Sequence, residues 1–552
     1  MKLKWLALFI LLGTQDVLAQ INSRYLLLFK DKADNVFSLE KAEEFLSPKA
    51  LARRYRQNIP ISESDLPVSP SYLARVAATG AKVISTTRWF NGALVEANES
   101  QLKAIKMLPF FSSIEGNHPV LFGTEPGEVR MAVKAQATES PVTLDYGLAR
   151  TQTTLLGADY FHQKGILGQE IVIAAFDEGF SRADQLEYFK LLFDEKRVLE
   201  TYDFIAGEVN VYDKQSHGTN VLSTIAAYQP GMIVGIAPKA KFVLYRTESN
   251  MMESPYEEVA WLLAAERADS IGVDIITSSL GYSTFIGPFN NADYNYTYED
   301  MDGHTTIVSR AARWASRKGI VVVNSAGNEA SSPWKYIIAP ADVDSVLSVG
   351  ATNRNLEYAS FSSIGPNALG QQKPDVSAVG LGVYIGTNVG TGTVVSSQGT
   401  SFSCPQVAGL VALAWQAYPF LTAQQVISVL KKSGNQADRP DNYLGYGVPN
   451  LRKLEQIVAT EYGPLAVEPQ PPMAIRVAPN PVMDPLTLLV PTVLKNQPAQ
   501  ISIIKGNGQE IYRTSGLLEP TVYLAIPDLS PGIYILKVQT KSQQQVIRIV
   551  KP

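Results

Sequence analysis

The chain has 552 residues, of which 45% are hydrophobic and 18% are charged, and its formal net charge is -4. At roughly 100 to 200 residues per domain this length predicts about three folded units, and the balanced charge excludes the basic surface that nucleic-acid binding needs. The single cysteine, Cys404, excludes an internal disulfide framework, so each unit must be held together by its core.

The N-terminus has the pattern of an export signal. Lys2 and Lys4 precede an apolar run from Trp5 to Leu12, and the fairly small residues Val17 and Ala19 stand at positions -3 and -1 before Gln20. This order is typical of a signal peptide, which we assign to residues 1–19, with a buried first helix as the alternative. No run in the chain approaches the 18 or so apolar residues that span a bilayer, so we predict no transmembrane segment.

Residues 20–140 have the pattern of a small α+β unit. Three apolar runs predict strands, at Tyr25–Phe29, Lys82–Ser85 and Ala93–Ala97. Three polar residues before helical patterns predict helix N-caps, at Ser47, Ser69 and Asn98. This unit contains no obvious catalytic set. Arg53 and Arg54 are compatible with a processing site, but we expect them on a helix that faces solvent.

Residues 141–460 alternate β-rich apolar runs with helical patterns, which predicts an α/β domain whose parallel sheet is covered on both faces. The expected strands are Ile171–Phe176, Lys241–Tyr245, Val273–Thr277, Ile320–Asn324 and Ser345–Val349. The expected helices are Asn220–Tyr228, Tyr256–Ala268, Thr306–Lys318 and Phe402–Tyr418. Such sheets bind ligands at the carboxyl ends of their strands, so polar residues directly after a strand are candidates for function.

Three polar residues stand out in this domain. Asp177 directly follows the first strand, His217 opens the helical segment His-Gly-Thr, and Ser401 lies in a small-residue turn before a helix. Each has a structural alternative, since aspartate forms turns, histidine packs in cores and serine caps helices. Pro405 favours a helix start beside Ser401, because proline is tolerated in a first turn but breaks a helix interior.

Together these residues supply the groups of an activated serine. A serine hydroxyl needs an imidazole to accept its proton, and the imidazole needs a carboxylate to orient it. The order Asp, His, Ser, within D-E-G-F, H-G-T-N and G-T-S-F-S-C-P-Q-V-A-G, resembles the subtilases, a family of subtilisin-like serine peptidases. The resemblance covers roughly residues 145–452. It implies a subtilisin-like three-layer domain with Asp177, His217 and Ser401 as catalytic triad and polypeptides as substrates.

The resemblance also implies residues that bind the substrate. In Ser-Ala-Gly-Asn-Glu, Asn328 matches the position whose side-chain amide donates to the oxyanion of the reaction. We assign substrate-binding roles to four further residues, Ser279, Leu280, Gly281 and Gly327.

Three positions depart from the family pattern. Tyr282 replaces a second glycine, which leaves the shape of the specificity pocket open. Glu178 replaces a small hydroxylated residue, and it either faces solvent or, pointing inward, raises the basicity of His217. Cys404 packs behind the nucleophile, where we expect a buried apolar filler and not a second nucleophile.

The chemistry implied by this resemblance needs no cofactor. Subtilases often bind structural calcium, and the loop from Asn290 to Asp302 is rich in oxygen donors. Polar loops between helices have the same composition, and the spacing does not match an EF-hand. Calcium is therefore possible, but we assign no metal ligands.

The flanking units are interpreted from the same resemblance. The α+β unit resembles the inhibitory propeptides that precede subtilisin-like enzymes, which implies that it acts as an intramolecular inhibitor. The stretch from Gly123 to Ser140 is polar and featureless, and we place the propeptide boundary near it.

The C-terminal part begins with a proline-rich linker at residues 461–473. Residues 474–552 show short alternating runs, with Gly506–Gly508 as a hairpin turn, which predicts a small β-sandwich. Ala478–Pro481 and the ending Ile549–Lys551 resemble the C-terminal sorting domain of the type IX secretion system. This implies that the type IX secretion machinery is a partner; an ordinary carbohydrate-binding or adhesive module is the alternative.

We therefore predict an endopeptidase precursor that a signal peptide exports to the periplasm and that is then secreted or attached at the cell surface. The alternative is a catalytically silent surface protein that uses the same scaffold for adhesion. Such a protein is expected to have lost at least one of Asp177, His217, Asn328 or Ser401, and all four are present.

Overall fold

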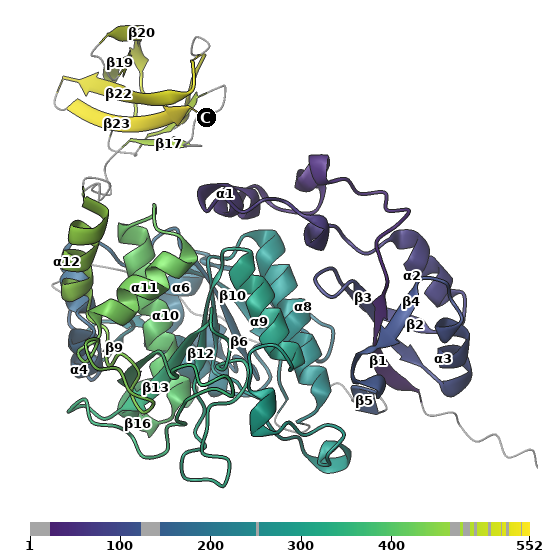
Figure 1. The fold of residues 1–552 in the computed structure, drawn as a ribbon. Coiled ribbons are helices and arrows are strands. Elements are labelled where there is room, and N and C mark those ends of the chain that lie inside the picture. The colour runs from purple at the N-terminus through teal and green to yellow at the C-terminus, as the bar shows by residue number, and fades with distance from the viewer. Residues whose placement is uncertain are drawn as a thin grey trace, which may run out of the picture.

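The computed structural model describes residues 22–122, 144–249, 253–463, 475–478, 486–490, 494–505, 509–519, 521–525, 529–541 and 544–551. The predicted signal peptide, most of the predicted linker, the proposed boundary near Gly123 to Ser140 and the turn at Gly506–Gly508 lie outside these residues. The described residues form a first unit (22–122), a central unit (144–463) and a third unit (475–551), as Figure 1 shows.

The central unit is built on a seven-stranded parallel sheet in the order β14-β13-β12-β11-β6-β10-β7. Its strands are β6 (Val172–Asp177), β7 (Val198–Asp203), β10 (Lys241–Arg246), β11 (Ile275–Ser278), β12 (Val321–Ser325), β13 (Leu347–Thr352) and β14 (Val376–Val379). From β6 the chain builds the sheet first to one side and then to the other. The carboxyl ends of β6 and β11 therefore flank the switch point at which such sheets bind ligands.

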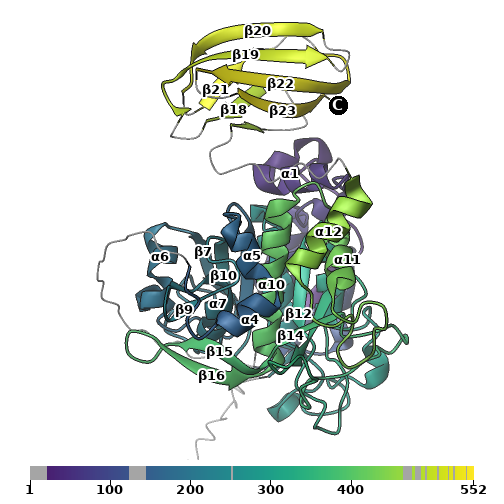
Figure 2. The ribbon, with the colours of Figure 1, turned by 90° about the vertical axis from the view of Figure 1, so that its left-hand side faces the viewer.

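Two helical layers cover the sheet, as Figures 1 and 2 show. One face carries α7 (His217–Ala226), α10 (Thr400–Ala417), α11 (Ala423–Ser433) and α12 (Leu451–Tyr462), and the other carries α8 (Pro255–Ile271) and α9 (Ile307–Arg317). Successive strand residues point to opposite faces, so Ile173 packs in the α10 layer and Ala174 in the α8 layer. Burial on both faces explains why the strands read as continuous apolar runs.

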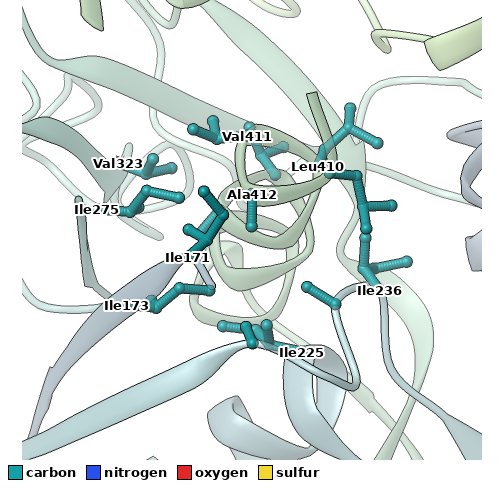
Figure 3. Close-up of a cluster of buried hydrophobic side chains, with 14 of the residues drawn as sticks. Ile171, Ile173, Ile225, Ile236, Ile275, Val323, Leu410, Val411 and Ala412 are labelled. Atoms are coloured by element: carbon teal, nitrogen blue, oxygen red, sulfur yellow. The ribbon is translucent and has the colours of Figure 1, made fainter. Parts of the chain in front are cut away.

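The core on the α10 side includes a cluster of mostly branched aliphatic residues, which Figure 3 shows. Ile173, Ile275 and Val323 from three neighbouring strands pack with Val411 and Ala412 of α10. Leu410 and Ile236 extend the same cluster. This packing fixes α10, and hence its N-terminus, relative to the carboxyl edge of the sheet.

The remaining elements of the central unit surround these layers. They are α4 (Arg150–Leu155), α5 (Ala158–Gln163), α6 (Lys190–Asp194), β8 (Tyr228–Gln229), β9 (Ile233–Val234), β15 (Leu381–Thr387) and β16 (Thr393–Gln398). All five predicted strands are present with shifted ends, but β7 and β14 were not predicted. Strand β7 is a partly exposed edge with charged residues, and β14 has four residues, so neither forms a long apolar run.

The first unit is a small antiparallel sheet with helices. Its elements are β1 (Ser23–Phe29), α1 (Pro48–Arg56), α2 (Pro70–Ala77), β2 (Lys82–Thr87), β3 (Gly92–Ala97), α3 (Glu99–Lys106), β4 (Phe111–Ile114) and β5 (Leu121–Phe122). The side chains of Ser47 and Asn98 cap α1 and α3 as predicted. Ser69 occupies the N-cap of α2, but its side chain makes no capping hydrogen bond.

The first unit packs against the α8 and α9 layer through buried charges. Asp269 of α8 accepts hydrogen bonds from Arg53, from Arg54 at 2.8 Å and from Arg88 at 2.5 Å. Glu266, one turn earlier, accepts from the backbone N–H of Arg88 at 2.9 Å. Arg53 and Arg54 are 2% and 1% exposed, so the expectation that they lie on a solvent-facing helix was wrong. Asp269 of α8 holds both guanidinium groups inside the interface.

The third unit consists of two small antiparallel sheets around one core. One sheet contains β17 (Arg476–Ala478), β18 (Leu486–Leu489) and β21 (Thr521–Leu524). The other contains β20 (Glu510–Leu517), β19 (Pro498–Lys505), β22 (Gly532–Thr540) and β23 (Gln544–Lys551). Apolar residues of both sheets share a core, as in the predicted β-sandwich.

Among the described residues, none of the helices combines the length and apolar character needed to cross a bilayer.

We expect Asp269→Asn to weaken the attachment of the first unit by about 3–5 kcal/mol, because three buried guanidinium groups lose their carboxylate. Amide hydrogen exchange of α1 should become faster. The control Glu461→Gln removes the exposed pair of Lys432 and Glu461, and should change stability by about 1 kcal/mol or less. Equal exchange of α1 in both variants would contradict this account.

Candidate active site

The predicted site residues gather at the carboxyl edge of the sheet. Asp177 is the last residue of β6, the segment from Ser279 follows β11, and the segment leading to Asn328 follows β12. These three strands are neighbours in the order β12-β11-β6. Residues 150 positions apart in the chain are therefore brought to one edge.

Asp177 and His217 are joined by a hydrogen bond. His217 Nδ1 lies 2.8 Å from Asp177 Oδ1, which also accepts the backbone N–H of Glu178 at 2.9 Å. The Asp177 side chain is fully buried, whereas that of His217 is 28% exposed. The carboxylate thus fixes one ring nitrogen and leaves the other side of the imidazole open.

Only glycine fits at the position after His217. A Cβ on Gly218 would lie 2.4 Å from the carbonyl oxygen of Gly179 and 2.9 Å from Cβ of Asp177. Any larger residue would push helix α7 away from the end of β6. The His-Gly pair is therefore a condition for the hydrogen bond between His217 and Asp177.

Ser401 is the second residue of α10 and is partly exposed. We expected Pro405 in the first turn of this helix, but it lies in the second, inside the helix. Because proline has no N–H, the carbonyl of Ser401 has no helical donor, and the Ser279 hydroxyl donates to it at 2.9 Å. The proline thereby allows a hydrogen bond that joins the segment after β11 to Ser401.

Asn328 is held by the residue before Ser401. Its Oδ1 accepts from the backbone N–H of Thr400 at 2.9 Å and from the Thr400 hydroxyl at 3.0 Å. Its Nδ2 makes no hydrogen bond with the described part of the chain, and the residue is exposed. The side chain is thus oriented by its oxygen, with its donor free beside Ser401.

The four predicted substrate-binding residues lie together. Gly281 and Gly327 both pack against Ile338, since a Cβ on either would come within 3.0 Å of its side chain. Asn324 of β12 donates to the carbonyl of Leu280 at 3.0 Å, which fixes the segment after β11. Tyr282 is 2% exposed, so its ring fills the interior where a glycine would leave space.

The ring of His217 lies beside that of Phe402, the residue after Ser401. The imidazole and the Phe402 ring lie 5.7 Å apart between centroids, which places the histidine beside the residue after Ser401. No hydrogen bond joins His217 to the Ser401 hydroxyl within the described residues, and such bonds often form only with substrate bound. Cys404 is buried, which raises the pKa of its thiol to about 12, so it remains protonated and unreactive.

Negative charge around His217 controls its protonation. Burial disfavours the imidazolium, but the charge and hydrogen bond of Asp177 outweigh burial and raise the pKa of His217 to about 9. Glu178 and Glu248 add to this effect. Glu178 is half-buried, and burial followed by the charge of Asp177 raises its own pKa. Glu178 is thus partly exposed, and its charge still favours the imidazolium of His217.

Sequence reasoning missed three residues that support the site: Thr400, Asn324 and Glu248. Thr400 and Asn324 stand directly beside motif residues, so adjacency was the available signal. Glu248 lies two residues beyond β10, the strand that pairs in register with β6 from Lys241↔Val172 to Arg246↔Asp177. It is a polar residue after a strand, and the same rule that selected Asp177 applies to it.

The polar side chains of the loop from Asn290 to Asp302 form hydrogen bonds within the loop and with the residues just after it. Asn290 Oδ1 accepts from Asn295, and Asp302 accepts from the backbone N–H groups of His304 and Thr305. Within the described residues no group of three or more His, Cys, Asp or Glu side chains is placed to hold a metal ion. The polar groups of this loop instead stabilise its own turns.

Three family models match the chain in succession. Residues 24–130 match the peptidase S8 propeptide domain of Bacteroidota, residues 168–447 match the subtilase family, and residues 476–552 match a secretion system C-terminal sorting domain. The three matches correspond to the first, central and third units.

Curated relatives are similar over more than half of the chain. Subtilisin DY of Bacillus licheniformis is 30% identical over 317 residues, which covers 57% of this chain and 99% of the relative. Subtilisin E of Bacillus subtilis (strain 168) is 27% identical over 385 residues, which covers 69% of this chain and 85% of the relative. Among solved structures, MycP1 from Mycobacterium smegmatis matches with a TM-score of 0.44 and 21% identity, over 59% of this chain and 89% of that one.

We expect Glu178→Gln to lower the pKa of His217 by roughly 0.5 to 1 pH unit, because it removes a negative charge that favours the imidazolium. The His217 ring, one of four histidines in the chain, can be followed by NMR through a pH titration. Glu187→Gln, a change at an exposed residue, serves as control. An unchanged His217 midpoint in Glu178→Gln would show that this carboxylate does not act on the ring.

Proposed function

Since this chain belongs to the subtilase family and is a subtilisin-like serine endopeptidase, we propose that it hydrolyses peptide bonds through an acyl-enzyme on Ser401. Asp177, His217 and Ser401 form the triad of this proposal, and Asn328 is the oxyanion donor. The observation that carries it is the 2.8 Å bond between Asp177 and His217 at the edge where α10 presents Ser401.

In the first step, the Ser401 Oγ attacks the carbonyl carbon of the substrate and its proton passes to His217 Nε2. The buried carboxylate of Asp177 holds the Nδ1–H and stabilises the imidazolium that forms. The C–N bond then breaks as His217 returns the proton to the leaving amine. A water molecule attacks the resulting ester in the same way, and the carboxylic acid product leaves Ser401 restored.

The tetrahedral intermediates carry an oxyanion that needs aimed donors. The free Nδ2 of Asn328 is one, since Thr400 occupies only the side-chain oxygen. The backbone N–H of Ser401, in the first turn of α10, is the second, because N–H groups there have no helical acceptor. The positive end of the helix dipole acts in the same direction.

We divide the precursor into a signal peptide (1–19), a propeptide (20–140), a catalytic domain (141–460), a linker (461–473) and a sorting domain (474–552). The propeptide assignment is supported by the family match and by the buried contacts of the first unit with α8. In this proposal the first unit inhibits the enzyme until it is cleaved off. N-terminal sequencing of the mature enzyme reads the boundary directly.

The chain carries a secretion system C-terminal sorting domain. We propose that the signal peptide first directs export to the periplasm, and that the type IX machinery then releases the protein or attaches it at the cell surface. The proposed triad needs no cofactor. A structural calcium ion is compatible with the family, and we assign no ligands to it.

We expect Ser401→Ala to abolish labelling of the matured enzyme by a fluorophosphonate probe, because the probe reacts only with an activated serine. Asn328→Ala should retain labelling at a reduced rate and lower kcat by about 100-fold to 1000-fold, the usual loss when one oxyanion donor is removed.

Ser403→Ala is the matched control, because it removes a neighbouring buried hydroxyl of the same helix. Equal labelling of wild type and Ser401→Ala would refute the nucleophile. Absence of labelling in the matured wild type would favour the silent surface protein.

A further inference from the structure

Two glutamates, Glu178 and Glu248, lie beside the proposed triad, and Glu253 and Glu257 lie near Glu248. None of the four has a catalytic role in the proposal. Glu178 follows Asp177, Glu248 follows β10, Glu253 stands just before α8, and Glu257 is in the first turn of α8. We call these four residues the glutamate cluster. Glu178, Glu248 and Glu253 are partly exposed, whereas Glu257 is 1% exposed. The cluster thus has an accessible rim and a buried floor.

Backbone hydrogen bonds hold the cluster against the triad. The N–H of Thr247 donates to the carbonyl of Asp177 at 3.0 Å, which ties the segment that carries Glu248 to the end of β6. The N–H of Ser249 donates to Oε1 of Glu257 at 2.8 Å, which ties the same segment to α8. Glu248 is therefore fixed between the catalytic aspartate and the start of α8.

No cation of the described chain neutralises this cluster. None of the four side chains is in an ion pair within the described residues. The nearby cations are the His217 imidazolium, which pairs with Asp177, and Arg246, whose Nη1 pairs with Asp203 at 3.0 Å and whose Nε donates to the backbone carbonyl of Glu178 at 2.9 Å. Neither of these two cations is paired with a carboxylate of the cluster in the described residues.

Two buried polar atoms beneath the rim have no partner. Oε2 of Glu257 and the hydroxyl of Tyr282 are buried without a hydrogen bond in the described chain. Tyr282 is 2% exposed, and burial followed by the charges of Glu248 and Glu257 raises the pKa of its hydroxyl, which therefore lies near these two carboxyls. Buried polar groups are normally paired, and these two mark a place where a donor from outside would be satisfied.

The electrostatics of the free enzyme agree with a missing cation. Burial and then the charge of Asp177 raise the pKa of Glu248 to about 8. Burial and the Glu248 carboxyl raise the pKa of Glu257 well above its usual value. A positive charge among these carboxyls would reverse both effects.

A metal ion fits the cluster poorly, because no set of three or more acidic, His or Cys side chains in the described residues converges closely enough to coordinate one. A side-chain cation has looser demands, since an ammonium or guanidinium group carries several donors that reach separate oxygens. The segment proposed to pair with the substrate, Ser279 to Gly281, runs directly into Tyr282. A bound polypeptide therefore passes beside the cluster.

We propose that the glutamate cluster is a subsite for a basic side chain, lysine or arginine, of the polypeptide substrate, close to the bond that is cut. Glu178 and Glu248 receive the positive charge at the rim, and Glu257 with the Tyr282 hydroxyl satisfies its deeper donors. This inference rests on the proposed function and adds the substrate class to it. It makes Glu248, which lies between the other members, the main determinant of specificity.

The test compares peptide pairs that differ at one position before the scissile bond, arginine in one and its neutral isostere citrulline in the other. We expect matured wild-type enzyme to favour the arginine peptide in kcat/KM by about 10-fold to 100-fold at one position, the usual worth of a charge-assisted hydrogen bond. Glu248→Gln should reduce this ratio toward one, and Tyr282→Phe, which removes one oxygen, should reduce it by a smaller factor.

The matched control is Glu187→Gln, a change at an exposed glutamate of the same domain, which should keep the wild-type ratio. A wild-type ratio near one at every position, or an unchanged ratio in Glu248→Gln, would overturn the subsite. Fluorophosphonate labelling of the same preparations separates this failure from that of the proposed function, which predicts labelling whatever the ratio. Loss of the ratio in the presence of a chelator would indicate a metal ion in place of the substrate cation.

Discussion

The buried carboxylate of Asp177 organises the site, because the main parts of the edge are arranged around it. Asp177 is the last residue of β6, at the centre of the sheet. Its carboxylate accepts hydrogen bonds from His217 and from the backbone N–H of Glu178, and its backbone carbonyl accepts from the N–H of Thr247. A buried carboxylate is tolerated only where such donors meet it. Gly218 leaves the space that lets the histidine come close. Chain segments from β6, β10 and α7 therefore meet at this one residue.

Helix α8 connects the site with the first unit. Its first turn holds Glu257 of the glutamate cluster, and its last turns hold Glu266 and Asp269, which bind the first unit. The two ends of α8 differ in which groups pair with their carboxylates. Arginines of the first unit neutralise Asp269, while Glu257 meets only backbone donors. The arginines of the first unit therefore do not neutralise the acidic end of α8 beside the triad, and this end can bind another cation.

The sequence predicted the α/β sheet and the positions of its catalytic residues, because both depend on local patterns. Buried strands appear in the sequence as apolar runs. Asp177 stands where a strand pattern ends, and Ser401 stands where a helix pattern begins. What it could not predict depends on distant partners. The burial of Arg53 and Arg54 needs Asp269, some 215 residues away, and local pattern describes only an amphipathic helix. The role of Pro405 also depends on a distant residue, Ser279. The hydroxyl of Ser279 donates to the Ser401 carbonyl that the proline leaves without a helical donor, and local pattern does not reveal this contact.

The most direct test of the catalytic account is a crystal structure of the matured enzyme with a peptide boronate, which mimics the tetrahedral intermediate. We predict a covalent bond from boron to Ser401 Oγ, with one boronate oxygen about 2.7–3.1 Å from both Asn328 Nδ2 and the Ser401 backbone N–H. His217 should remain bonded to Asp177 and face a second boronate oxygen. A boronate attached elsewhere, or one whose oxygen points away from Asn328, would contradict the account.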